Sequence, residues 1–288
     1  MFIIRLRTTI VYVLIFSVAI SAVYLVFAAG ESNEYKEESD GISLPVLMYH
    51  SICSSSGKEG KFIVSETGLE QDLKYISENG YTTVSASQII DFVYNGTQLP
   101  DKPILLTFDD GYYNNYCYAF PLLKKYNAKA VISIIGKYTD IYSETEEENP
   151  LYSHITWDEA REMCESGLVE IENHSYNSHT TDKGRNGTKK KKGESEAAYA
   201  EYISSDIGKL QEEIYANLGY KPQLFAYPFG SVSEASYDIL KQIGFKMTLS
   251  CEEKVNYLKT GDTDGIYMLG RYLRTNKRSA ERILKNIK

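Results

Sequence analysis

The sequence is poor in the residue types that build many metal and redox sites, because only four of its 288 residues are cysteine and four are histidine. The cysteines stand singly at Cys53, Cys117, Cys164 and Cys251, so a CxxC zinc-thiolate site is not predicted. Basic residues are also in deficit, with 31 lysines and arginines against 39 acidic residues and a net charge of -8. This balance argues against nucleic acid as a partner, since phosphate binding requires a basic surface.

Long apolar runs are equally scarce, with one exception at residues 10–30. That run has about the ~20 residues that a helix needs to cross a bilayer. Arg5 and Arg7 precede it and acidic residues follow it, which predicts a cytoplasmic N-terminus and an extracytoplasmic remainder. We expect residues 1–30 to be a single-pass anchor in the cell membrane, or a signal peptide whose removal would secrete the protein. Residues 31–43 are expected to form a flexible tether, and residues 44–288 one catalytic domain.

From Leu44 onward, short apolar runs alternate with amphipathic stretches of helical length, which indicates repeated βα units around a mainly parallel sheet or barrel. Strands are expected at residues 46–49, 82–84, 104–108, 130–135, 169–171, 224–227, 247–249 and 266–269. Helices are expected at residues 66–78, 86–94, 116–126, 157–166, 196–218, 233–243 and 279–287. The predicted fold class is an α/β barrel, in which the chemistry gathers where loops follow the C-terminal ends of the strands.

Chemically capable side chains stand at these strand ends. Asp109 and Asp110 follow a run of apolar residues, and adjacent residues on an extended backbone point to opposite sides. One carboxylate can therefore bind a metal while the other addresses a water molecule. His174 and His179 follow a later strand, and with Asp110 they would supply three ligands and leave positions open for water and substrate. An Asp-Asp-Gly turn alone, or a surface loop with two histidines, would need no metal.

Three segments carry a resemblance to a known family. They are Thr107–Gly111 (TFDDG), His174–His179 (HSYNSH) and Ala226–Gly230 (AYPFG). These segments resemble the first three motifs of the polysaccharide deacetylases, the NodB-homology family also called carbohydrate esterase family 4. The segment Pro45–Ser51 resembles the branch that contains poly-N-acetylglucosamine deacetylases. The resemblance extends from about Leu44 to Arg274 and implies a distorted (β/α) barrel with fewer than eight regular units.

The resemblance implies a metal-dependent hydrolase that removes N-acetyl groups from a polysaccharide. Asp109 would be the catalytic base, and Asp110, His174 and His179 would hold one divalent metal ion. Zn²⁺ is the expected ion, although Co²⁺, Ni²⁺, Mn²⁺ or Fe²⁺ suit the same donors.

The third segment is implied to bind the substrate. The backbone N–H of Phe229 would contact the oxyanion that forms when water attacks the acetyl carbonyl. Pro228 would fix the turn that presents this N–H group, and Tyr227 belongs to the same substrate-binding segment.

Two departures from the family pattern leave roles to be filled. Many members have an arginine where this chain has Ala226, and many have a late histidine as general acid, whereas no histidine follows His179 here. His50 is the candidate acid, because the similar branch is permuted so that an early histidine takes that place. Arg271 could pair with Asp109 and keep it ionised. The alternatives are a core histidine at His50 and a purely structural ion pair at Arg271.

Three further features are interpreted as structural. His154 is expected to belong to loop structure before the helix that Trp157 begins. The basic run Lys189–Lys192 is typical of a solvated loop. The loop Thr180–Ala198 that contains it follows the histidine segment and is a candidate border of the substrate groove.

The substrate stays open at this stage, because a fold does not choose among substrates. Peptidoglycan, poly-N-acetylglucosamine, chitin oligomers and acetylated xylan all present an acetyl group. A hydrolase of small amides and a non-catalytic glycan-binding or sporulation module are the competing functions. The expected partners are an N-acetylated polysaccharide and, through the N-terminal helix, the membrane, with the protein acting as a monomer.

Overall fold

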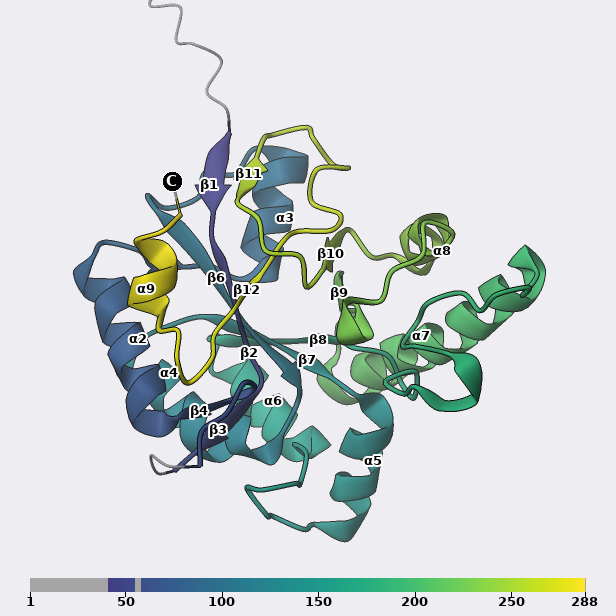
Figure 1. Cartoon of the computed structure of the whole chain (residues 1–288), viewed down its shortest axis with the longest axis horizontal. Coiled ribbons are helices and arrows are strands. Elements are labelled where there is room, and N and C mark those ends of the chain that lie inside the picture. Colours follow the sequence, from purple (N-terminus) through teal and green to yellow (C-terminus); the bar gives the residue numbers. More distant parts are fainter. Residues whose placement is uncertain (1–40, 55–57, 288) are drawn as a thin grey trace, which may run out of the picture. The chain divides into compact units, whose positions relative to one another are not determined.

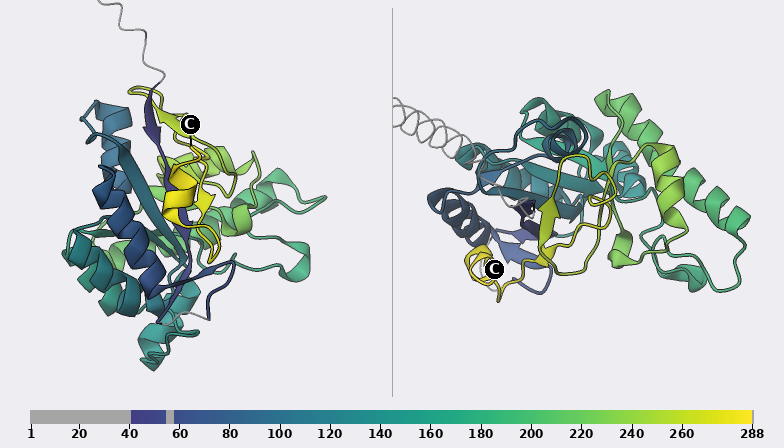
Figure 2. Two further views of the ribbon diagram at one scale, coloured as in Figure 1. Left: turned by 60° about the vertical axis from the view of Figure 1, so that its left-hand side comes forward. Right: turned by 90° about the horizontal axis from the view of Figure 1, so that it is seen from above.

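Parallel strands form the centre of the chain from Ile42 onward (Figures 1 and 2). The computed structural model describes residues 41–54 and 58–287. The expected anchor at residues 1–30 and most of the tether at residues 31–43 lie outside the described residues. Within residues 41–54 and 58–287, no helix is both long enough and apolar enough to span a membrane.

Eight strands share one parallel sheet in the order β10-β9-β8-β7-β6-β2-β12, with β5 pairing to β6. The strands of this sheet are β2 (Val46–Tyr49), β5 (Thr82–Thr83), β6 (Pro103–Asp110), β7 (Ala130–Ile134), β8 (Val169–Asn173), β9 (Leu224–Ala226), β10 (Met247–Leu249) and β12 (Tyr272–Leu273). Their near-continuous apolar sequences are what a sheet covered on both faces requires. The curled parallel sheet confirms the expected α/β class of NodB-homology type.

Two small sheets flank this one. Strand β1 (Ile42–Leu44) pairs antiparallel with β11 (Asn256–Leu258), and β3 (Ser51–Cys53) pairs parallel with β4 (Ile63–Ser65). Each has only three residues. Such short strands give too few alternations for a pattern to be seen, and they were not predicted.

Helices connect the strands and cover the sheet (Figure 1). They are α2 (Glu66–Glu78), α3 (Ala86–Asn95), α4 (Phe120–Tyr126), α5 (Gly136–Thr145), α6 (Trp157–Glu165), α7 (Glu196–Leu218), α8 (Ser236–Ile243) and α9 (Ala280–Leu284), with the π-helical turn η1 (Asn115–Ala119) and the 3₁₀ turns η2 (Asp182–Gly184) and η3 (Pro228–Gly230). Several start at caps that the sequence signals: Ser85 and Thr156 each close a capping box. Gly219 ends α7 in the left-handed conformation.

One predicted strand is absent, and strand β12 and helix α5 were not predicted. Residues 266–269 do not form a strand: only Leu269 makes an isolated bridge, to Leu249. Met268 has a φ of 64°, and its N–H bonds the hydroxyl of Thr248 instead of a ladder carbonyl. Helix α5 was missed, because its sequence GKYTDIYSET is mostly polar and buries only Gly136 and Thr139.

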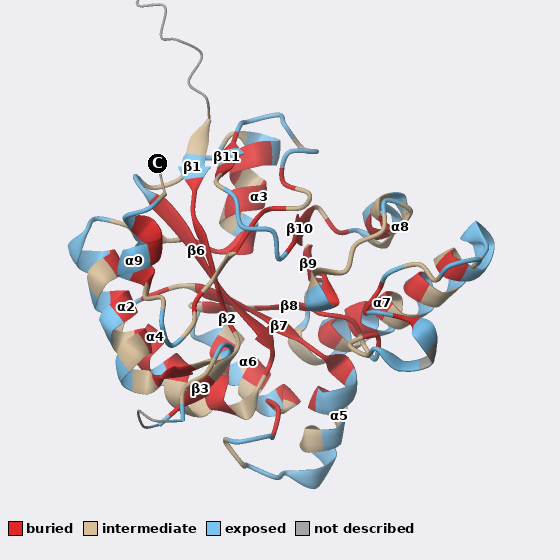
Figure 3. Ribbon diagram, viewed as in Figure 1, coloured by how far each residue is buried: buried red, intermediate tan, exposed pale blue. Residues whose placement is uncertain are grey.

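Alternate residues of the central strands face different parts of the core, which is buried throughout (Figure 3). On β6, Leu106 and Phe108 pack in the cluster that α2, α4, α6 and α9 cover, whereas Leu105 packs in a second cluster with α3. Because the strand period is two, Thr107 and Asp109 lie on the same face as Leu105. The strand therefore delivers Asp109 to the face opposite the first helical layer.

A buried ion pair joins the C-terminal segment to this framework. The carboxylate of Asp72 in α2 accepts hydrogen bonds from Arg274 Nε at 2.5 Å, from the Tyr49 hydroxyl at 3.1 Å and from the Ala280 N–H at 2.8 Å. Asp72 is 1% exposed and Arg274 6%. Helix α2, strand β2 and helix α9 thus converge on one carboxylate, just after the segment that carries Arg271.

We expect Asp72→Asn to lower the free energy of unfolding by about 3–5 kcal/mol, because it leaves the buried Arg274 guanidinium without its counter-charge. Denaturant unfolding measures the change. Glu70→Gln on the same helix is the control, since its pair with Lys125 is at the surface, and no measurable change is expected there. An Asp72→Asn protein as stable as the native chain would contradict this role.

Candidate active site

The site is organised by a change of backbone conformation at the end of β6. Asp110 has a φ of 74° and Gly111 a φ of 65°. A Cβ atom on Gly111 would lie 2.9 Å from Cγ2 of Ile134, so this position requires glycine both for its conformation and for the space. The two carboxylates do diverge as expected, but the cause differs: Asp110 is left-handed, not extended.

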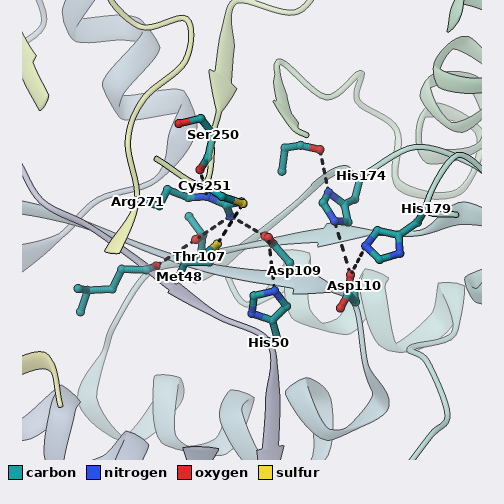
Figure 4. Close-up of polar contacts among 12 residues, drawn as sticks. Met48, His50, Thr107, Asp109, Asp110, His174, His179, Ser250, Cys251 and Arg271 are labelled. Carbon is teal, nitrogen blue, oxygen red and sulfur yellow. Dashed lines mark hydrogen bonds and ion pairs between the residues drawn. The ribbon is translucent and has the colours of Figure 1, made fainter. Parts of the chain in front are cut away.

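Asp110, His174 and His179 form the one cluster of potential metal ligands found within the described part of the chain. The Nε2 atoms of His174 and His179 lie 3.5 Å and 3.3 Å from Oδ1 of Asp110 (Figure 4). All three candidate ligand atoms are within 4.8 Å of one another. Oδ1 of Asp110 is buried and makes no hydrogen bond. A buried carboxylate oxygen without a hydrogen-bond partner, close to two imidazole nitrogens, is a suitable site for a divalent cation. Asp110, His174 and His179 would be its ligands.

The tautomer of His174 supports this assignment. Its Nδ1 lies 2.7 Å from the carbonyl oxygen of Ala226, so Nδ1 donates its proton there and Nε2 keeps a free lone pair. Burial lowers the pKa of His174 to about 3, and burial also lowers the pKa of His179. Both rings are therefore neutral near pH 7, as metal ligation requires. Burial raises the pKa of Asp110 to about 6, although the nearby His50 acts to lower it. The protein by itself therefore compensates the negative charge of the Asp110 carboxylate poorly.

Asp109 has a separate set of partners, centred on Arg271. Nη1 of Arg271 lies 2.6 Å from Oδ1 of Asp109, and its Nε donates to the Ser250 carbonyl at 2.8 Å (Figure 4). Arg271 is fully buried. Burial alone would raise the pKa of Asp109, but the Arg271 guanidinium, with His174 and His50, holds that pKa below its usual range. The predicted pairing is thus present, and Asp109 is ionised.

His50 lies below Asp109 in the labelled view, whereas Arg271 is on the side of Asp109 that faces away from the metal ligands (Figure 4). Its Nε2 is 4.0 Å from Oδ2 of Asp109, and its ring lies 4.9 Å from that of Phe62. The ring lines the cavity, and its buried Nδ1 has no hydrogen-bond partner. A histidine satisfied within the core would not combine these features, so the geometry favours the acid position over the core alternative.

The third predicted segment, η3, is placed as a turn beside the ligands. Phe229 has a φ of 58°, is 47% exposed, and its ring lies 4.2 Å from that of His179. Tyr227 differs from the expectation: its side chain is fully buried, bonds Ser236 through its hydroxyl and does not line the cavity. Pro228 is buried beneath the turn. Only Phe229 of this segment reaches the cavity wall.

A cavity of about 720 Å³ opens over these groups. Residues that sequence reasoning did not select also line it, among them Lys61, Phe62, Tyr112, Leu151, Cys251 and Glu253. They carry no motif. Tyr112, Cys251 and Glu253 follow strands, as many other residues do, whereas Lys61, Phe62 and Leu151 stand in loops without even that signal.

The loop Thr180–Ala198 does not line this cavity. It packs under the turn instead: a Cβ atom on Gly187 would lie 2.7 Å from the Pro228 carbonyl oxygen. Lys190 N donates to the Ser233 hydroxyl, and Thr188 accepts from Tyr199. The loop therefore supports the Pro228–Phe229 turn from outside the cavity.

Comparisons with known proteins agree with this geometry. The polysaccharide deacetylase family profile matches residues 96–248, more than half of the chain. A poly-β-1,6-N-acetyl-D-glucosamine N-deacetylase of Escherichia coli K12 is 28% identical over 231 residues, which cover 72% of this chain and 33% of that protein. The protein of the same name from Staphylococcus aureus MRSA252 is 28% identical over 201 residues, covering 69% and 65%.

Among solved structures, a de-N-acetylase from Aggregatibacter actinomycetemcomitans superposes with a TM-score of 0.71 at 29% identity and covers 84% of this chain and 99% of that one. The chain spans about a third of the length of its Escherichia coli relative. The motifs, the curled parallel sheet and the family match agree. This chain therefore belongs to the polysaccharide deacetylase family.

Proposed function

We propose that this protein is a divalent-metal-dependent hydrolase that removes N-acetyl groups from an N-acetylglucosamine polysaccharide. The observation that carries the proposal is the placement of an ionised carboxylate, Asp109, beside an Asp-His-His ligand set within one open cavity. A hydrolase of amides needs these two components side by side. A non-catalytic glycan-binding module needs neither.

The residues divide the reaction between them. When bound by Asp110, His174 and His179, a divalent ion supplies Lewis acidity to water and to the acetyl carbonyl. Asp109 takes a proton from the attacking water, and Arg271 keeps Asp109 ionised for this step. His50, beside Asp109, gives a proton to the leaving amine, so that acetate and a free amino sugar result. The Phe229 N–H group is the proposed donor to the oxyanion.

The walls of the cavity favour a sugar over a small amide. Phe62, Leu151 and Phe229 present exposed apolar surface at its rim, with 45%, 72% and 47% of each residue accessible. Apolar and aromatic faces suit the faces of sugar rings. The relatives named poly-β-1,6-N-acetyl-D-glucosamine N-deacetylase make that polymer the first substrate to test, ahead of peptidoglycan.

The location of the activity is proposed from the sequence pattern alone. The apolar run at residues 10–30, with Arg5 and Arg7 before it, would place the catalytic domain outside the cytoplasmic membrane. There it would meet an envelope or matrix polysaccharide. We propose that it acts as a monomer.

Metal removal tests the proposal. Acetate release from poly-β-1,6-N-acetylglucosamine should disappear after chelation and return when Zn²⁺ or Co²⁺ is added, because the site would lose and regain its Lewis acid. The same assay on peptidoglycan and chitin oligomers ranks the substrates. Undiminished release from a demonstrably metal-free protein would refute metal dependence, and no release from any glycan would refute the substrate class.

Arg271→Gln should move the acidic limb of the kcat/KM profile upward by about 1–3 pH units. Without the guanidinium, burial raises the pKa of Asp109. Because a carboxylate base is protonated and inactive when the pH falls below its pKa, activity should be lost at a higher pH. Arg161→Gln, which breaks an exposed pair with Asp158, is the matched control and should leave the profile unchanged. If folded, metal-loaded Arg271→Gln keeps the native acidic limb, Arg271 has only a structural role.

A further inference from the structure

His154 lies directly behind the metal-ligand cluster, although the sequence suggested only loop structure for it. Its Nδ1 is 2.9 Å from the main-chain carbonyl oxygen of Asp110, and the residue is 7% exposed. A carbonyl can only accept, so Nδ1 is the protonated nitrogen and donates to Asp110. The ligand-bearing residue is thus held from behind by a side chain 44 positions away.

The backbone around this bond is tied down on both sides. Tyr112 and His154 form an antiparallel bridge. The N–H of Ile155 donates to the Gly111 carbonyl at 2.9 Å, and the N–H of Tyr113 donates to the Ser153 carbonyl at 2.7 Å. Residues 110–113 therefore have a short strand-like partner in residues 153–155, immediately after the left-handed turn.

Three tyrosines fix the imidazole ring. Its centroid lies 4.6 Å from that of Tyr138, 4.8 Å from that of Tyr112 and 5.7 Å from that of Tyr142. Stacking against these rings restricts rotation of the imidazole about its Cβ–Cγ bond. The main-chain carbonyl of Asp110 is therefore bonded by a ring that an aromatic group holds in place.

A restraint is needed at this position because Asp110 is a non-glycine residue in the left-handed region. Such residues are strained and persist only where the surrounding structure holds them in place. If Asp110 relaxed toward an extended conformation, its side chain would turn away from His174 and His179. Holding the carbonyl oxygen of Asp110 is a direct way to prevent that rotation.

We propose that His154 is a positioning residue that keeps the carboxylate of Asp110 aimed at the metal through its hydrogen bond to the Asp110 carbonyl. This inference rests on the proposed function in one respect, since it requires that Asp110, His174 and His179 bind a metal. It assigns His154 no contact with substrate. Residues of this kind, one step behind the ligands, alter metal affinity when they are changed.

The test compares variants of the full chain that separate the hydrogen bond from the ring. His154→Phe keeps an aromatic ring among the tyrosines and removes the donor. His154→Asn loses the ring but can place its amide N–H where Nδ1 was. We expect His154→Phe to weaken Zn²⁺ binding about 10–100-fold and His154→Asn to restore most of the loss. Competition with a chromophoric chelator gives the dissociation constants.

Tyr138→Leu is the matched control, because it removes a stacking partner of His154 and leaves the bond to Asp110 in place. It should bind Zn²⁺ with nearly native affinity, and the absorption spectrum of bound Co²⁺ should change only in His154→Phe. Melting temperatures of the metal-free proteins show whether each variant folds.

Equal affinity in folded His154→Phe and native protein would overturn the inference and leave the proposed function intact. A Tyr138→Leu variant as weak as His154→Phe would also overturn it, by assigning the effect to packing. A native chain that binds no Zn²⁺ or Co²⁺ would overturn the proposed function itself.

Discussion

The active site depends on one local constraint: β6 ends in two residues with positive φ. Asp109 keeps the ordinary backbone conformation of the strand, and the next two residues, Asp110 and Gly111, both have positive φ. This turn sends two adjacent carboxylates to different partners, Asp109 to Arg271 and Asp110 to the two histidines. The absence of a side chain at Gly111 lets the turn close against Ile134 on the neighbouring strand. The turn therefore separates the proposed base, Asp109, from the proposed metal ligand, Asp110, although the two residues are consecutive.

The electrostatics of the site follow from burying these groups. Asp109 is stabilised as an anion by a guanidinium that is itself inaccessible to solvent, so the pair is not screened by water. Asp110 lacks such a partner, and its orphaned oxygen is what a cation would compensate. All four histidines of the chain lie against these two residues: His50 faces the Asp109 carboxylate, His174 and His179 face the Asp110 carboxylate, and His154 bonds the main-chain carbonyl of Asp110. A residue type that is scarce in the sequence is thus concentrated at one place in the fold.

The sequence was sufficient to predict the parts of the site that stand at the ends of regular strands. Asp109 and Asp110 follow the strand predicted at residues 104–108, and His174 and His179 follow the one predicted at residues 169–171, so the strand rule brought them together correctly. His50 and Arg271 also follow predicted strands, but their roles came from the resemblance to a family, and the strand predicted before Arg271, at residues 266–269, does not form.

Features that depend on tertiary contacts were not predictable in this way. Tyr227 shares a motif with Phe229, but a turn with positive φ sends one side chain into the core and the other to the cavity. The role of His154 depends on a contact with a main-chain oxygen, which leaves no periodic pattern in the sequence. Phe62 and Leu151 reach the rim from loops, outside the regular strands and helices that periodic patterns predict.

Asp109 is proposed as the base and its neighbour Asp110 as a ligand of the metal. Both roles are tested by the rate of acetate release from native protein and from Asp109→Asn, with the metal content of both determined in the same samples. We expect equal metal content and a rate at least about 10²-fold lower in the variant, the scale of a lost general base. A variant that keeps its metal and releases acetate at the native rate would show that Asp109 is not the base.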